Sequence, residues 1–143
     1  MGVYIPKSRT EEGIFAMSFS HTITYQFSSN GAPATLFTSS NSFDGQVDIS
    51  VDVPAASSNF SIVCPVNTTL LQSLVIWTTG ACTVLTKDSG GATLDTLTFG
   101  AANQPLIWNV SSPGSNPLSG TIATLAVSCT PATTVNAYFG LNV

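Results

Sequence analysis

The sequence predicts an all-β fold, an antiparallel β-sandwich that is jelly-roll-like and has about eight or nine strands. Short segments rich in Val, Ile, Thr and aromatic residues recur along the chain, several of them with strict polar and apolar alternation. Gly, Pro, Asn and Asp lie between these segments and mark turns. No stretch keeps a helical period of 3.6 residues over three turns, so we expect almost no helix.

The predicted strands follow one another from residue 21 to residue 141. Val47–Val53 is the clearest, because its Val and Ile residues alternate with Asp48, Ser50 and Asp52, as in a strand with one wet face. His21–Phe27 alternates in the same way. The other predicted strands are Phe60–Cys64, Leu70–Trp77, Cys82–Lys87, Thr93–Phe99, Pro105–Asn109, Thr121–Cys129 and Thr133–Leu141.

Three segments without a strand pattern are expected to connect these strands. Residues 88–91 (Asp-Ser-Gly-Gly) suit a hairpin loop, because paired glycines accept positive φ angles. Residues 111–120 hold two Pro and two Gly and are predicted to form the longest loop. Residues 31–44 are expected to be loops around a short edge strand at Leu36 and Phe37.

Charge is scarce and unevenly placed in the 143 residues. The chain has 3 Lys or Arg and 7 Asp or Glu, a net charge of −4, whereas Ser and Thr number 19 each. Lys7, Arg9, Glu11 and Glu12 all fall in the first twelve residues. We therefore divide the chain into an extended N-terminal arm, residues 1–17, and a single β-sandwich domain, residues 18–143.

The scarcity of basic residues and the short apolar runs exclude two classes of partner. A nucleic-acid-binding protein needs a basic stripe against the phosphates, and the predicted domain holds one Lys and no Arg. No apolar run approaches the roughly 20 residues that cross a bilayer as a helix. We expect neither a nucleic acid nor a membrane as partner.

Candidate catalytic and metal-binding residues are few, and we predict no enzymatic activity, no cofactor and no metal. His21 is the only histidine, so a Ser-His-Asp triad would have to use it, but no GxSxG motif accompanies it. Asp48 and Asp52 share one face of their strand about 13–14 Å apart, too far for one carboxylate pair. A calcium site built with loop carbonyls stays a minor alternative.

The cysteines and the tryptophans can each be interpreted in two ways. Cys64, Cys82 and Cys129 are widely spaced, which favours buried free thiols over one disulfide plus a free thiol. Trp77 and Trp108 end apolar strands, which favours core packing; the alternative is a ring exposed at the sheet rim that stacks on a sugar.

The hydroxyl-rich surface suits a protein that other subunits cover. Ser, Thr and Asn carry little charge to desolvate and few long side chains to immobilise. Lys and Glu are depleted at interface cores for the same reasons. The composition therefore favours a structural subunit over an enzyme.

Several segments together resemble small β-sandwich virion proteins of tailed bacteriophages, of the capsid decoration or cement type. They are Ser20–Phe27, Val47–Pro54, Thr83–Phe99, Gln104–Trp108 and Ala132–Leu141. The resemblance implies a non-enzymatic protein on the capsid surface of a virion, assembled in the host cytoplasm. It also implies binding to the major capsid protein and a homo-oligomer, with a trimer favoured.

Within this hypothesis the N-terminal arm is the predicted anchoring segment, through Tyr4, Ile5, Lys7 and Arg9. The alternative function is a tail- or fibre-associated host-recognition sandwich that binds surface glycans through an exposed Trp77 or Trp108.

Overall fold

A computed structural model describes residues 18–100 and 104–143 of the chain, and within these ranges it is all-β. One 3-10 turn, η1 (Thr68–Leu70), interrupts the strands. The strands are β1 (Phe19–Ser29), β2 (Ala32–Phe43), β3 (Gly45–Val53), β4 (Ser57–Asn67), β5 (Leu71–Thr78), β6 (Cys82–Lys87), β7 (Thr93–Phe99), β8 (Leu106–Asn109), β9 (Thr121–Cys129) and β10 (Thr133–Leu141).

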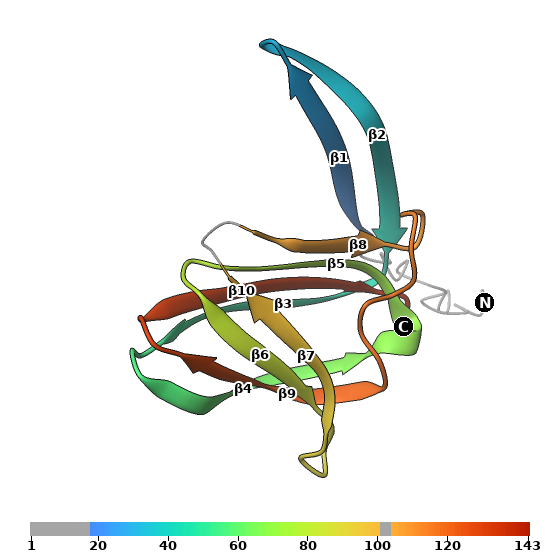
Figure 1. The fold of residues 1–143 in the computed structure, drawn as a ribbon. Helices are drawn as coiled ribbons and strands as arrows, with labels where there is room; N and C mark the ends of the chain where they lie inside the picture. Colours follow the sequence, from blue (N-terminus) through green and yellow to red (C-terminus); the bar gives the residue numbers. More distant parts are fainter. Residues whose placement is uncertain (1–17, 101–103) are drawn as a thin grey trace, which may run out of the picture.

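Eight of these strands form two antiparallel sheets packed face to face (Figure 1). One sheet has the order β3-β10-β5-β8 and the other β4-β9-β6-β7. The chain crosses from one sheet to the other at each connection except the β6–β7 hairpin, which stays within one sheet. The first and last strands of the sandwich, β3 and β10, lie side by side, as in an eight-stranded jelly roll. The predicted jelly-roll-like sandwich is confirmed.

The core lies between the two sheets and follows from strand alternation. In β3, Ile49 and Val53 are buried while Asp48 and Asp52 are exposed, as the alternating sequence predicts. Each fully buried Leu, Ile or Phe contributes about 1.5–3 kcal/mol to stability. The largest fully buried apolar side chains are Phe139, Leu74, Ile76, Ile122 and Leu125.

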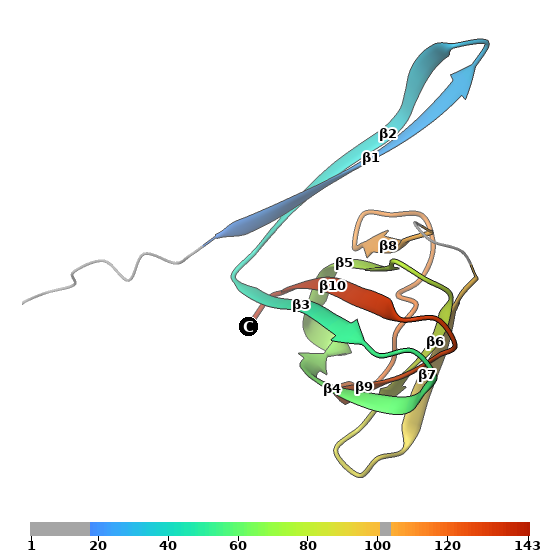
Figure 2. The same cartoon turned by 90° about the vertical axis from the view of Figure 1, so that its left-hand side faces the viewer.

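Strands β1 and β2 form a third sheet that stands apart from the sandwich (Figures 1 and 2). They pair from Phe19↔Phe43 at the base to Ser29↔Ala32 at the tip. Asn30 and Gly31 join them with φ angles of 53° and 81°. Positive φ at both positions is the geometry of the tight type I′ hairpin turn, for which Asn-Gly is the preferred sequence.

The hairpin corrects the expectation for residues 31–44. The sequence predicts loops around a short strand at Leu36 and Phe37, whereas β2 runs over twelve residues. Its Ser and Thr side chains face hydroxyls of β1, and such cross-strand pairs stabilise a strand that lacks an apolar pattern. Within the predicted domain of residues 18–143, therefore, the sandwich itself begins at β3.

The base of the hairpin rests on the sandwich through an aromatic ring above a glycine. Phe43 is 3% exposed, and Gly140 of β10 lies beneath its ring. A Cβ atom on Gly140 would lie 2.6 Å from Phe43 Cζ, which real Cβ contacts essentially never allow. The base of the hairpin can therefore pack on β10 only because residue 140 has no side chain.

The turn between hairpin and sandwich is held by the chain's C-terminal residues. The backbone N–H of Asp44 donates to the Leu141 carbonyl at 3.2 Å, and the Asp44 carboxylate accepts from the Val143 N–H at 2.7 Å. These bonds fix the direction in which the chain leaves Phe43 for β3.

The two predicted loops are present. Residues 88–91 form the β6–β7 turn, in which the Asp88 carboxylate accepts from the N–H groups of Gly90 and Ala92, both at 2.9 Å. Residues 111–120 contain no strand. Among the described residues, no helix is long and apolar enough to cross a membrane.

We predict that Gly140→Ala lowers the free energy of unfolding by about 1–3 kcal/mol, because the added methyl group displaces the Phe43 ring. Urea denaturation measures the change. The matched control is Gly100→Ala, since a Cβ at Gly100 meets nothing within 4 Å. Equal stability of the two variants would contradict the close packing of Phe43 on Gly140.

Candidate docking site: the hairpin and the sheet face beneath it

Strand β1 separates apolar from polar side chains onto two faces of the hairpin. Its odd-numbered residues include Phe19, Ile23, Tyr25 and Phe27, while its even-numbered residues from 20 to 28 are Ser, Thr or Gln. Register places Phe43 and Phe37 of β2 opposite Phe19 and Tyr25, on the apolar side. The hairpin therefore has one apolar face and one hydroxyl face.

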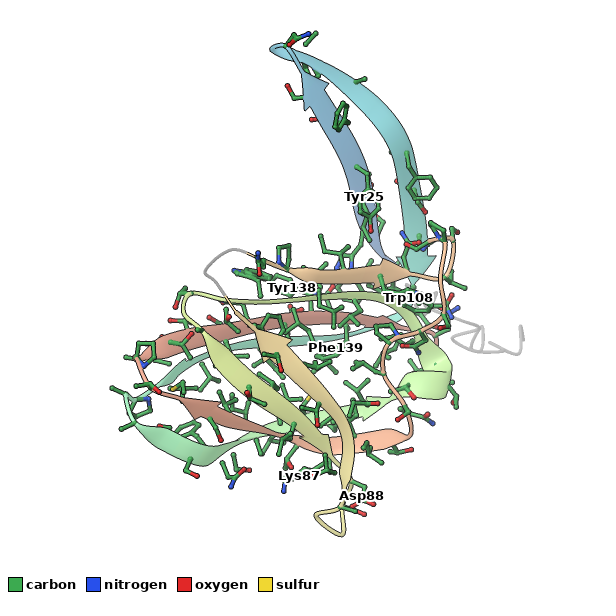
Figure 3. All side chains as sticks on the ribbon, viewed as in Figure 1. Tyr25, Lys87, Asp88, Trp108, Tyr138 and Phe139 are labelled. Atoms are coloured by element: carbon green, nitrogen blue, oxygen red, sulfur yellow. The ribbon has the colours of Figure 1, made fainter. Side chains whose placement is uncertain are left out.

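Only the lower half of the apolar face is covered by the sandwich. Ile23 and Phe43 are buried there, whereas Tyr25 is 40% and Phe27 is 59% exposed. Tyr25 and Phe37 pack on each other across the strands, with ring centroids 6.0 Å apart. The upper half therefore presents aromatic surface to solvent, and Figure 3 shows Tyr25 on the hairpin above the sandwich.

On the hydroxyl face, side chains of β1 and β2 are hydrogen-bonded to each other across the two strands. Thr22 and Ser40 are joined at 2.6 Å between hydroxyl oxygens, and the Thr38 hydroxyl donates to that of Thr24 at 3.5 Å. No Asp, Glu, Lys or Arg occurs between residues 13 and 43. The hairpin is thus neutral apart from any charge on His21.

A second apolar area lies on the outer face of the sheet beneath the hairpin. Register aligns Tyr138 with Val75 and aligns Val75 in turn with Ile107, all of them half-buried. Trp77 packs beside Tyr138 with ring centroids 5.3 Å apart. The outer sheet face thus carries a row of apolar side chains across three strands.

His21 joins the hairpin to this sheet. Its Nδ1 is hydrogen-bonded to Ser73 Oγ at 3.0 Å, and its ring meets Phe43 edge-on at 4.6 Å and Tyr138 at 6.4 Å. Burial lowers the pKa of His21 below its ordinary value, an effect that the carboxylate of Asp48 partly opposes. The neutral imidazole is therefore the form that fits the junction.

The hydrogen bond between His21 and Ser73 does not make a nucleophile accessible. Ser73 has no exposed surface, because the base of the hairpin covers it. A substrate carbonyl would have to reach its oxygen for acyl transfer. The pair is a packing contact between β1 and β5.

The carboxylates of β3 lie on the exposed face of the sheet and bind neighbouring side chains. Asp48 accepts from Gln46 Nε2 at 2.6 Å, and Asp52 accepts from the Thr134 hydroxyl at 2.6 Å. In the parts of the chain that the structure describes, no group of three His, Cys, Asp or Glu residues could hold a metal ion.

The two tryptophans differ in environment. Trp108 packs against the core, and its indole N–H donates to the Gly114 carbonyl at 3.3 Å. Trp77 lies on the outer face, half-buried against Tyr138. Both rings are half-buried. The preferred interpretation, core packing, fits Trp108, whereas Trp77 packs on the outer face of the sheet.

The predicted anchoring residues Tyr4, Ile5, Lys7 and Arg9 lie outside the described residues. The aromatic residues of the hairpin were not among the predicted site residues. Two signals in the sequence mark them: the Asn30-Gly31 turn between two strand-compatible segments, and the absence of charge up to Phe43.

Comparisons with known proteins give little. No family model matches the chain, and no curated protein matches it. A solved structure from a study entitled "Bacillus endospore appendages form a novel family of disulfide-linked pili" has a TM-score of 0.35 and 12% identity, over 69% of this chain and 88% of that chain. A likeness this weak carries no inference about this protein.

We predict that acidification weakens the packing of the base of the hairpin on the sandwich. Because the pKa of His21 is lowered in the folded state, the folded protein binds fewer protons than the unfolded chain as pH falls below about 6.5. The stabilisation is complete above that pH and is lost as pH falls through the folded pKa. Thermal unfolding at pH 8 and pH 5 measures the loss.

The control for this prediction is His21→Gln, which keeps a hydrogen-bonding side chain but has no charge to gain. Its unfolding temperature is expected to fall less than that of the unmodified protein between the two pH values. An equal fall in both proteins would show that His21 does not carry the effect.

Proposed function

We propose that this chain is a non-enzymatic structural protein of a virion, a capsid decoration or cement protein that docks on the major capsid protein through the β1–β2 hairpin. The observation that carries the proposal is the hairpin itself. Figure 2 shows that its two strands extend away from the sandwich, and it carries no Asp, Glu, Lys or Arg. Its Tyr25 and Phe27 side chains are exposed. The capsid as partner rests on the sequence resemblance, because a jelly roll alone does not specify function.

The exposed half of the hairpin has the chemistry of an interface core. Aromatic residues are enriched in such cores, and charged residues are depleted because their desolvation is costly. Here Tyr25, Phe27 and Phe37 form the aromatic surface. A partner that covers them desolvates rings and hydroxyls but no Lys, Arg, Asp or Glu side chain.

The hairpin also offers strand edges. Strands β1 and β2 pair only with each other in the described part of the chain, so each keeps one edge of backbone N–H and C=O groups unpaired. Soluble proteins usually protect long strand edges with charged side chains, especially Lys, or with Pro. Strand β1 has none of these, which supports strand addition by a partner as the docking mode.

The proposal extends to the oligomer and the arm. A homo-oligomer, with a trimer favoured, would present several hairpins and arms at once. Multivalent contact would then raise the affinity for a capsid lattice without a large individual interface. Sedimentation of the purified chain tests the oligomeric state, and deletion of residues 1–16 tests whether the arm contributes to anchoring.

We predict that Tyr25→Ser and Phe27→Ser together weaken binding to capsid shells assembled without this protein. Loss of a buried aromatic contact at an interface costs about 2 kcal/mol or more, which is roughly a 30-fold rise in Kd. Co-sedimentation with the shells measures the binding.

The matched control is Val63→Ser, which removes an apolar side chain that is 76% exposed on β4 of the sandwich. It is expected to bind as the unmodified chain does. Unchanged binding by the Tyr25 and Phe27 double variant, with normal thermal stability, would contradict docking through the hairpin.

A second candidate function, a tail- or fibre-associated protein that binds surface glycans, is favoured by Trp77 beside Tyr138 on the outer sheet face. Aromatic rings of this kind stack on sugars. Binding on a glycan array that is lost in Trp77→Ala would favour this function over capsid decoration, and no binding to any glycan would count against it.

A further inference from the structure

Two of the three cysteines face each other across neighbouring strands. Cys82 begins β6 and Cys129 ends β9, and the register of these antiparallel strands pairs the two residues directly. Both belong to the inward-facing set of their strands, so their side chains lie on the same side of the sheet. The structure contains both as free thiols.

The separation of such a pair suits a disulfide. Residues directly opposed in an antiparallel sheet have Cα atoms about 4.5–5.5 Å apart, and disulfides span Cα distances of about 4.4–6.8 Å. The Cβ atoms have to approach by roughly 1 Å. This is feasible because each cysteine lies at a strand end rather than in the middle of the ladder.

The pair also lies at an opening of the sandwich. An open hollow of about 420 Å³ is lined by both cysteines together with residues that include Ser57, Thr98 and Thr130. Cys82 is 6% and Cys129 is 8% exposed, whereas Cys64 has no exposed surface. Burial raises the pKa of Cys64 to about 12 and also raises the pKa of Cys82. Of the three thiols, Cys64 is the one with no exposed surface through which a disulfide reagent could reach it.

We propose that Cys82 and Cys129 are a redox site that forms a disulfide by exchange with small-molecule disulfides such as oxidised glutathione. One protein thiolate attacks a glutathione sulfur and releases glutathione thiolate, and the second protein thiolate then attacks the mixed disulfide at the protein sulfur. Two protein thiols lose two protons and two electrons, and one oxidised glutathione becomes two reduced molecules.

The bond would join the two halves of one sheet. In the order β4-β9-β6-β7, strands β6 and β7 connect to the rest of their sheet only through the β6–β9 ladder. A disulfide between Cys82 and Cys129 closes this ladder covalently at one end. Oxidation would therefore keep β6 and β7 from separating from β9, a stabilisation suited to a protein that leaves a reducing compartment.

The experiment treats the full native chain with excess oxidised glutathione and counts thiols after unfolding. We expect the count to fall from three to one, with the mass of an internal disulfide rather than of a glutathione adduct. We also expect the oxidised protein to unfold at a higher temperature. Three remaining thiols, or a stable glutathione adduct as the product, would overturn the proposal.

Peptide mapping identifies the bonded pair. Trypsin cleaves after Lys87, which separates Cys82 from Cys129 but leaves Cys64 and Cys82 on one peptide. The mapping is therefore done in Cys64→Ser, which is expected to form the disulfide and show the rise in unfolding temperature. Cys82→Ala and Cys82→Ser are each expected to show neither, and a rise in either variant would also overturn the proposal.

Discussion

The position of the hairpin depends on one contact, the Phe43 ring on the bare backbone of Gly140. This contact buries the last residue of β2 on β10, and Asp44 then turns the chain into β3, which pairs with the same strand. Strand β10 thus carries both the hairpin and the first strand of the jelly roll. His21 and Ser73 add a polar contact beside it. Together they give the hairpin a fixed base and leave its upper half free.

The sandwich could be predicted from the sequence because its signals are local. The alternation of Val47–Val53 marks one buried face without any knowledge of the partner strand. The same holds for the Asp88 turn, where the side chain of one residue satisfies two nearby N–H groups. The nine predicted strands therefore match strands of the structure, with shifts of a few residues at their ends.

The hairpin was harder to predict because its strands depend on each other. Strand β2 has no apolar alternation in its Ser- and Thr-rich part, and only the register with β1 explains why those residues are extended. The Asn30-Gly31 turn was a usable local signal. The Phe43 and Gly140 contact joins residues almost a hundred positions apart, and no pattern in a single sequence indicates it. The same is true of the pairing of Cys82 with Cys129.

The functional proposal joins these features. A rigid sandwich holds a neutral hairpin away from its surface, and the aromatic rings on the exposed half remain without cover in the described chain. The scarcity of charge, which in a freely soluble protein would favour aggregation, suits surfaces that are covered after assembly.

Hydrogen exchange of the chain, free and bound to capsid shells, tests the central claim most directly. Docking through the hairpin predicts that amides of β1 and β2 slow on binding, most strongly around Tyr25 and Phe27, while amides of the sandwich core change little. Hairpin amides that exchange equally fast in both states, with protection confined to the sandwich, would contradict the account.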